Sequence, residues 1–176
     1  MKSLDPRGSS FHSPKIEIRS SSKQGIGIFA KDTIRKDELI VVTNGRFIFF
    51  PESEKPENHP GIPFQIERMI YVAPWDRSHP EGIFAVNHSC DPNAGIRGQL
   101  SLVALRVIQP GEEICYDYVM TDSDPDGADI KPMECRCGTK SCRKMISDLD
   151  WKRNDLQEKY RGYFSTYLQQ RIDSER

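Results

Sequence analysis

The segment Cys135-Arg136-Cys137-Gly138-Thr139-Lys140-Ser141-Cys142 places three cysteines in a CxCx4C pattern near the end of the 176-residue chain. The lysine and arginine residues around it favour the thiolate form of cysteine. A segment this hydrophilic cannot form a core of its own, so a bound metal ion is the simplest way to stabilise it. Tetrahedral zinc takes four ligands. The cluster supplies three, and the fourth must come from another part of the chain.

Two cysteines remain as candidates for the fourth ligand. Cys90 lies in the polar segment Asn87-His88-Ser89-Cys90-Asp91-Pro92-Asn93, whereas Cys115 lies between Ile114 and Tyr116 on an apparent strand. Cys115 competes for the ligand position, but its surroundings are more typical of a packing residue. The sequence therefore predicts one zinc ion bound by Cys90, Cys135, Cys137 and Cys142, which would attach the C-terminal loop to the middle of the chain.

Two other segments carry recognisable patterns. Gly25-Ile26-Gly27 taken alone indicates a turn, and it lacks the third glycine of a dinucleotide-binding loop. If Glu113 to Tyr118 is a strand, Tyr116 and Tyr118 face the same side, because alternate residues of a strand share a face. Two aromatic residues on one face are also common in ordinary cores. Asn87-His88 is likewise as typical of a turn with a structural histidine as of a binding site.

The chain thus contains four elements: the glycine turn, the Asn-His-Ser-Cys segment, the segment with two tyrosines and the cysteine cluster. In this order and at these separations, they together resemble the SET-domain protein lysine methyltransferases with a post-SET zinc motif. The resemblance runs from about Lys15 to Lys144. It implies a mainly β fold with α-helices: several small sheets, a knot-like C-terminal threading, a post-SET zinc loop and a C-terminal helix. It also implies a flexible N-terminal segment (1–14), a SET domain (15–120), an acidic loop with the zinc motif (121–150) and a helical C-terminal segment (151–176).

The resemblance implies a cofactor and a reaction. The cofactor is S-adenosylmethionine, whose methyl group is transferred to the side-chain amine of a lysine in a protein or peptide substrate. The turn formed by Gly25, Ile26 and Gly27 would let the main chain approach the methionine part of the cofactor. Asn87 and the backbone of His88 would bind the edge of the adenine.

The resemblance also implies roles for three tyrosines and a tryptophan. Tyr118 would lie at the centre of methyl transfer, and Tyr116 would limit the product to mono- or dimethyl-lysine. Tyr71 would form a second wall of the lysine channel. Trp151 would cover the cofactor, although core packing explains a tryptophan at this position at least as well.

Composition limits the alternatives. The chain is 36% hydrophobic and 29% charged, which is typical of one globular core. Its net charge of −1 gives no excess of cations for phosphate, so we expect no direct nucleic-acid binding. No apolar run is long enough to span a membrane, and residues 1–14 lack a signal-peptide core. Of the five cysteines, three are too close together for a simple disulfide pairing, which indicates reduced thiols and a metal. We therefore expect a soluble intracellular protein, cytoplasmic or nuclear, of unknown oligomeric state.

Periodicity predicts the local elements. Alternation indicates strands at 15–19, 64–67 and 100–105, and Pro51 to Pro63 reads as a surface loop. From Asn154 onward the spacing becomes helical, with an Asn154 and Gln157 capping box and a break at Gly162. We expect this helical segment to pack an aromatic face against the sheet domain. The run Asp122 to Gly127 begins like a calcium loop, but Met133 stands where the last ligand should be. A solvated acidic turn is the default interpretation, and its place beside the expected channel suggests a secondary use in attracting a basic, lysine-bearing substrate segment.

Two other classes of function remain as alternatives. A catalytically silent SET-like binding module would keep the fold without methylation. A zinc-dependent nucleic-acid-binding module would use the cysteines alone, but the neutral charge opposes it.

Overall fold

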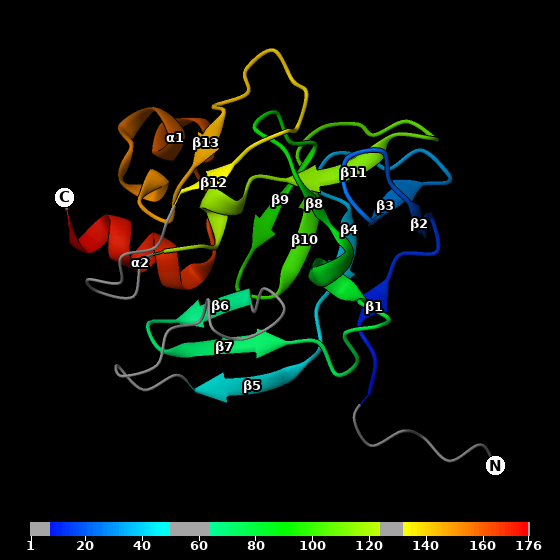
Figure 1. Cartoon of the computed structure of the whole chain (residues 1–176), viewed down its shortest axis with the longest axis horizontal. Helices are drawn as coiled ribbons and strands as arrows, with labels where there is room; N and C mark the ends of the chain where they lie inside the picture. Colours follow the sequence, from blue (N-terminus) through cyan, green and yellow to red (C-terminus); the bar gives the residue numbers. More distant parts are fainter. Residues whose placement is uncertain (1–7, 50–63, 124–131, 176) are drawn as a thin grey trace.

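Short strands in four sheets make up most of the regular secondary structure among the described residues (Figure 1). The computed structural model describes residues 8–49, 64–123 and 132–175. The first sheet has the order β1 (Phe11–His12), β4 (Leu39–Val42), β10 (Ser101–Ala104) and β9 (Ala94–Arg97), and all its pairs are antiparallel. The second has the order β2 (Ile16–Ser20), β3 (Ile26–Ala30), β11 (Glu113–Tyr116) and β8 (Asn87–His88).

The remaining elements lie around these two sheets. The third sheet has the order β5 (Arg46–Phe49), β7 (Ile70–Ala73) and β6 (Phe64–Glu67), and β12 (Met133–Glu134) pairs with β13 (Met145–Ile146). Three 3-10 turns are η2 (Gly82–Ala85), η3 (Tyr118–Met120) and η4 (Asp150–Lys152). The two α-helices are α1 (Asn154–Lys159) and α2 (Thr166–Ser174). The predicted fold class, mainly β with α, is confirmed. The knot-like threading stays a prediction.

One parallel strand pair positions the site. Every other strand pair among the described residues is antiparallel, but β8 runs parallel to β11, with Cys115 opposite Asn87 and Tyr116 opposite His88. A parallel pair joins segments that are distant in sequence, because it requires a long connection. The Asn-His-Ser-Cys segment therefore lies directly beside the Tyr-Asp-Tyr segment.

The core lies between the first two sheets and the C-terminal helices. Its fully buried aliphatic members include Ile28, Ile40, Ile96, Leu102 and Ile114, one each from β3, β4, β9, β10 and β11. The C-terminal segment adds Trp151, Tyr160, Phe164 and Leu168 to the same cluster. The predicted packing of an aromatic C-terminal face against the sheets is therefore confirmed.

The structure corrects two local predictions. The strand expected from Glu113 to Tyr118 ends at Tyr116, and Tyr118 begins η3. The capping box is also wrong: Arg153 is the N-cap of α1, and the Gln157 amide donates to the carbonyl of Trp151 instead.

The predicted helix break is confirmed, and the chain turns at Gly162 with φ +83° before α2 begins. Ser165 caps α2, with its hydroxyl accepting from the Leu168 N–H, so the cap lies at the second helix rather than the first.

Some predictions fall outside the described residues. The loop from Pro51 to Pro63, residues 1–7 and most of the acidic turn after Asp122 belong to this group. Within the described ranges, no helix has both the length and the apolar character that a bilayer crossing requires.

Candidate active site

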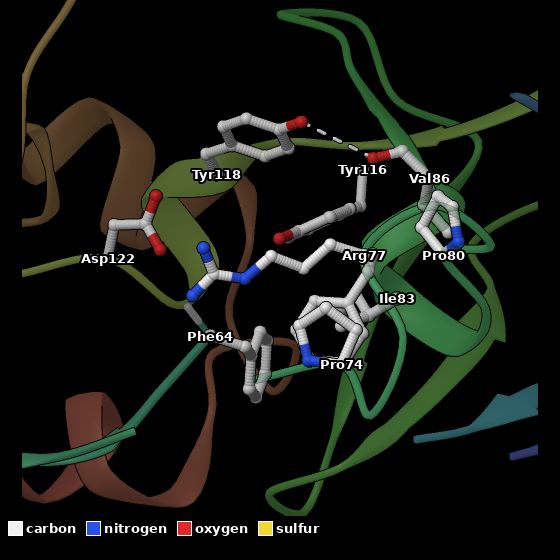
Figure 2. Close-up of a pocket in the computed structure, with 10 residues that line it drawn as sticks. Phe64, Pro74, Arg77, Pro80, Ile83, Val86, Tyr116, Tyr118 and Asp122 are labelled. Atoms are coloured by element: carbon white, nitrogen blue, oxygen red, sulfur yellow. Dashed lines mark hydrogen bonds between the residues drawn. The ribbon is translucent and has the colours of Figure 1, made fainter. Parts of the chain in front are cut away.

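A cavity of about 220 Å³ opens beside the end of β11 (Figure 2). Its described walls are apolar on one side and carry hydroxyl and charged groups on the other. They consist of Phe64, Pro74, Arg77, Pro80, Ile83, Phe84, Val86, Tyr116, Tyr118 and Asp122. Tyr71 in β7 is buried but is not among these residues. Its role as a channel wall stays a prediction.

Tyr116 and Tyr118 lie side by side in this cavity, with ring centroids 5.0 Å apart. The Tyr118 hydroxyl donates to the Val86 carbonyl at 3.3 Å, and the Tyr116 hydroxyl lies 3.5 Å from Oγ1 of Thr121. Burial raises the pKa of both phenols above their ordinary value. Both hydroxyls are therefore neutral at physiological pH. Because the Tyr118 proton is directed to Val86, its oxygen remains free to accept a hydrogen bond from a group in the cavity.

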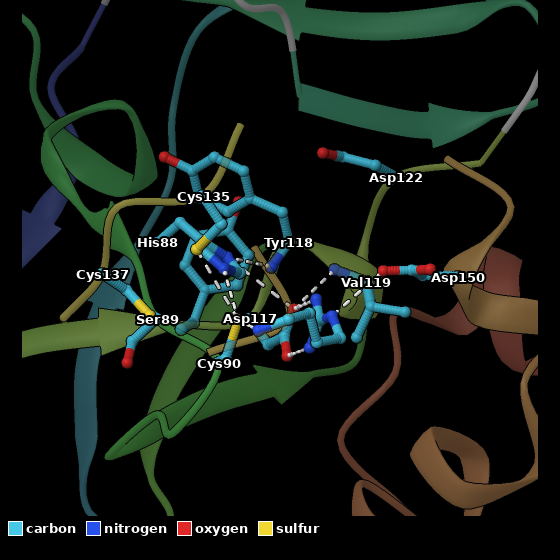
Figure 3. A network of polar contacts seen from close by, with 12 residues as sticks. His88, Ser89, Cys90, Asp117, Tyr118, Val119, Asp122, Cys135, Cys137 and Asp150 are labelled. Carbon is cyan, nitrogen blue, oxygen red and sulfur yellow. Dashed lines mark hydrogen bonds and ion pairs between the residues drawn. The ribbon is translucent and has the colours of Figure 1, made fainter. Parts of the chain in front are cut away.

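Between the two tyrosines, Asp117 is fully buried and accepts hydrogen bonds from three segments (Figure 3). Two guanidinium nitrogens of Arg143 lie 2.5 and 2.7 Å from its two oxygens. The Tyr160 hydroxyl donates at 2.9 Å, and the Val119 N–H donates at 3.2 Å. Arg143 Nε also lies 3.1 Å from Asp150, though not in hydrogen-bonding geometry. A bidentate, fully bonded pair of this kind can balance the cost of burying two charges.

His88 links this region to the cysteines. The Tyr118 N–H donates to His88 Nδ1 at 3.3 Å, so the hydrogen-bond network assigns the ring proton to Nε2, which lies 3.4 Å from the sulfur of Cys90. Burial lowers the pKa of His88 to about 4, and the nearby Asp117 only partly opposes this. The 3.7 Å approach of His88 to Asp117 is therefore not an ion pair at neutral pH.

The four predicted ligands come together. The sulfur atoms of Cys90, Cys135, Cys137 and Cys142 all lie within 4.8 Å of one another. The Cys90 and Cys135 sulfurs are 3.7 Å apart, and tetrahedral zinc with bonds of about 2.3 Å would separate its ligands by about 3.8 Å. Cys115 is buried in β11 outside this group, and burial raises the pKa of its thiol to about 12. The cluster could hold a metal ion, and Cys90 is its fourth member.

Polar groups around the cluster stabilise negative sulfur. The Arg143 N–H points to the Cys90 sulfur at 3.4 Å. The pKa of the Cys137 thiol is lowered despite partial burial, because the Thr139 hydroxyl lies 3.2 Å from its sulfur. Strands β12 and β13 frame the loop, and Tyr118 packs against the cluster. The donors and the spacing suit a thiolate metal site.

The side-chain amide nitrogen of Asn87 is bonded within the protein, which leaves the amide oxygen available to a ligand. Its side-chain nitrogen donates to the Ile26 carbonyl at 2.9 Å and to the Glu113 carboxylate at 2.7 Å. Both partners accept only, so the amide orientation is fixed. Ser21 and Lys23 also contact Glu113. The Asn87 oxygen, which accepts no hydrogen bond from the described residues, suits an amino group of a bound ligand.

Gly25 and Gly27 of the glycine turn have different surroundings. Gly25 has φ +52° and no heavy atom within 4 Å of the Cβ position, so its side is open. A Cβ on Gly27 would lie 2.5 Å from Glu113 Oε1. The space above Gly27 is thus filled by this carboxylate, whereas the space beside Gly25 is open. The contact of Gly27 and the His88 backbone with a cofactor stays a prediction.

Trp151 is fully buried in η4 and belongs to the core. The Arg171 guanidinium lies 4.5 Å from its ring centroid, and its indole N–H has no hydrogen-bond partner. These contacts fit core packing, which was the alternative role expected for Trp151. A contact with the cofactor stays a prediction.

Sequence reasoning did not assign roles to Asp117, Arg143, Tyr160 or Glu113. Asp117 had a visible signal, since it separates the two tyrosines, but its partners lie on segments that only folding brings together. The acidic turn was noticed, yet nothing in its sequence showed that Asp122 lines the cavity.

Together the fold and site define a mainly β domain in which a cysteine cluster able to hold a metal lies beside a tyrosine-lined cavity. The SET domain family model matches residues 25–119. The chain belongs to the SET domain family.

Several named proteins are similar in sequence to most of the length of this chain. Human histone-lysine N-methyltransferase 2B is 30% identical over 143 residues, which cover 75% of this chain and 5% of the relative. Histone-lysine N-methyltransferase set-2 of Caenorhabditis elegans is 32% identical over 149 residues, covering 78% and 10%. SUV39H1-A of Danio rerio is 28% identical over 170 residues, covering 73% and 40%. The chain thus spans less than half the length of each of these relatives.

Solved structures show the same fold. The crystal structure of KRYPTONITE in complex with mCHG DNA and SAH matches with a TM-score of 0.55 and 22% identity, covering 75% of this chain and 29% of that one. The methyltransferase domain of human SETMAR matches with a TM-score of 0.55 and 21% identity, covering 75% and 57%.

The cysteine geometry predicts about one zinc ion per chain. Elemental analysis of purified protein should find it, and Cys137→Ser and Cys90→Ser should each lose it, because three thiolates remain. Cys115→Ser should keep it. Loss of zinc in Cys115→Ser with retention in Cys90→Ser would transfer the fourth ligand to Cys115.

The Asp117 contacts predict that Arg143→Met leaves a buried carboxylate without its cation. The free energy of unfolding should fall by about 3 to 5 kcal/mol. Arg106→Met is a matched control, because Arg106 pairs with Glu112 at the surface, where such a pair contributes about 0 to 1 kcal/mol. Denaturant titration monitored by circular dichroism measures both values. Equal losses of unfolding free energy in the two variants would show that the pair of Arg143 with Asp117 stabilises the fold no more than a surface pair does.

Proposed function

We propose that this chain transfers a methyl group from S-adenosylmethionine to the side-chain amine of lysine in a protein substrate. The observation that carries the proposal is the cavity where the neighbouring Tyr116 and Tyr118 meet apolar walls, beside the Asn87-His88 strand. The names of the relatives support it, since they are histone-lysine methyltransferases of several species. KRYPTONITE, with the same fold, has been solved with an H3(1–15) peptide and SAH.

When bound, S-adenosylmethionine supplies an electrophilic methyl group on a sulfonium. In this chain, the fixed oxygen of Asn87 is the acceptor for a cofactor amino group, and the open side of Gly25 leaves space for the main chain to approach the ligand. Gly27 allows Glu113 to hold Asn87 in this orientation. These residues bind the cofactor and take no part in bond making.

The apolar side of the cavity prepares the lysine. A free lysine has a pKa of about 10.4 and is mostly protonated at neutral pH, hence unreactive. Burial beside Phe64, Ile83 and Val86 disfavours the charged form and increases the share of neutral amine. The Tyr118 oxygen, whose proton is directed to Val86, accepts an N–H of the amine and orients its lone pair.

Tyr116 limits the number of methyl groups. Its hydroxyl lies near Thr121, inside the same cavity, and can bind the amine or a water next to it. This contact restricts rotation of an amine that already carries a methyl group. We therefore propose mono- or dimethyl-lysine as the product. The zinc ion supports the cavity wall and takes no part in the reaction.

Turnover should depend on the Tyr118 hydroxyl. Labelled S-adenosylmethionine with a cell extract or core histones should give methylated lysine, and Tyr118→Phe should lower the rate by about 10²-fold or more while calorimetry shows unchanged cofactor binding. Cofactor binding with no methylated product in the wild type would favour a silent binding module. Near-wild-type turnover in Tyr118→Phe would leave this residue a packing role.

The product distribution should depend on Tyr116. Tyr116→Phe removes a hydroxyl and keeps the wall, so mass spectrometry should show a shift toward trimethyl-lysine. An efficient wild-type trimethylase, or an unchanged distribution in the variant, would disprove the role of Tyr116.

A further inference from the structure

Asp122 stands in the wall of the cavity opposite its apolar side. Its N–H donates to the Tyr118 carbonyl at 2.9 Å, which fixes its place relative to that tyrosine. The carboxyl group points into the cavity (Figure 2). One oxygen accepts from the Thr121 hydroxyl at 2.9 Å, and among the described residues the carboxylate has no ion-pair partner. A carboxyl group with no ion-pair partner among the described residues therefore faces the space where the tyrosine rings meet.

The groups around Asp122 make an uncompensated charge costly. Burial and the carboxylates of Asp148 and Asp117 raise its pKa to about 8, and the hydrogen bond from Thr121 only partly opposes this. The two phenols that face it, Tyr116 and Tyr118, are neutral. A cation that enters the cavity would stabilise the ionised carboxylate, so cation binding and ionisation of Asp122 are linked.

A cationic side chain of the protein already occupies this space. Arg77, from the segment between β7 and η2, lines the cavity, and its guanidinium extends toward the Asp122 side (Figure 2). Arg77 is otherwise exposed, so its position depends on few contacts. The cavity therefore accepts a long cationic chain, and a substrate lysine would compete with Arg77.

We propose that Asp122 is a specificity-determining residue that binds the ammonium group of the incoming lysine, which competes with Arg77 for space in the cavity. The role of the cavity rests on the proposed methyltransferase function. Binding selects a cation, and the ammonium group then gives its proton to solvent water, which leaves a neutral amine for methyl transfer. A residue with this role acts on substrate affinity more than on the chemical step.

The zinc-loaded protein can be titrated with n-butylammonium, which mimics a lysine side chain, and with the neutral 1-butanol, monitored by NMR. The wild type should bind the ammonium ion with shifts near Tyr118 and Asp122. Asp122→Asn should weaken this about tenfold or more and leave 1-butanol binding unchanged, because a hydrogen bond to a charged group is lost. Glu158→Gln, an exposed carboxylate of α1, should behave as wild type.

Two further measurements use the same titration. Between pH 6 and 9 n-butylammonium stays charged, since alkylamines have a pKa of about 10. Wild-type affinity should rise across this range as Asp122 ionises, while Asp122→Asn should show no rise. Arg77→Gln removes the competing cation and should strengthen binding. Unchanged affinity in Asp122→Asn, or weaker binding in Arg77→Gln, would overturn the proposal.

Steady-state kinetics separates this proposal from the function on which it rests. Asp122→Asn should raise KM about tenfold or more with kcat within about threefold. An inactive wild type would refute the methyltransferase function, and the titration would still test the cation site. An active wild type with an unchanged KM in Asp122→Asn would refute only the role of Asp122. Thermal unfolding checks the fold of the variant, which relieves repulsion with Asp148.

Discussion

The buried ion pair of Arg143 with Asp117 is the interaction on which the rest of the site depends. Asp117 has no exposed surface, so its charge requires partners, and these come from the cysteine loop and from Tyr160, which directly follows α1. Asp117 lies between Tyr116 and Tyr118 in the chain, so these contacts hold the backbone segment that carries both rings. One carboxylate therefore connects the cysteine loop, the C-terminal segment and the cavity.

The cysteine cluster and the cavity are joined a second time through His88. The neutral ring accepts from the backbone of Tyr118 and faces the sulfur of Cys90. The carbonyl of Cys90 in turn accepts from Lys159 and Tyr160 of the C-terminal segment. A metal bound at the cysteines would thus hold the Asn-His-Ser-Cys segment and the end of β11 together, which is a structural role transmitted to the site by hydrogen bonds.

The cavity combines groups with opposite effects on charge. Apolar walls and two neutral phenols disfavour an ammonium ion, whereas Asp122 favours one. A site built this way can admit a cation at the carboxylate and hold an uncharged amine beside the tyrosines. The positions of Asp122 and Tyr118 on one short turn, η3 and the residues after it, keep the two environments at a fixed separation.

The sequence by itself determined the family, the mainly β fold and the four cysteines that come together, because these depend on spacing and residue type within short segments. Cys90 was preferred over Cys115 from local polarity alone, and the structure places it in the cluster. Sequence could not show that Arg143 reaches Asp117, that Glu113 fixes the Asn87 amide or that Asp122 faces the cavity. Nor did it show that Trp151 is enclosed by the core. These relations join residues far apart along the chain or depend on the direction of one side chain, and only the packing of the folded chain decides either.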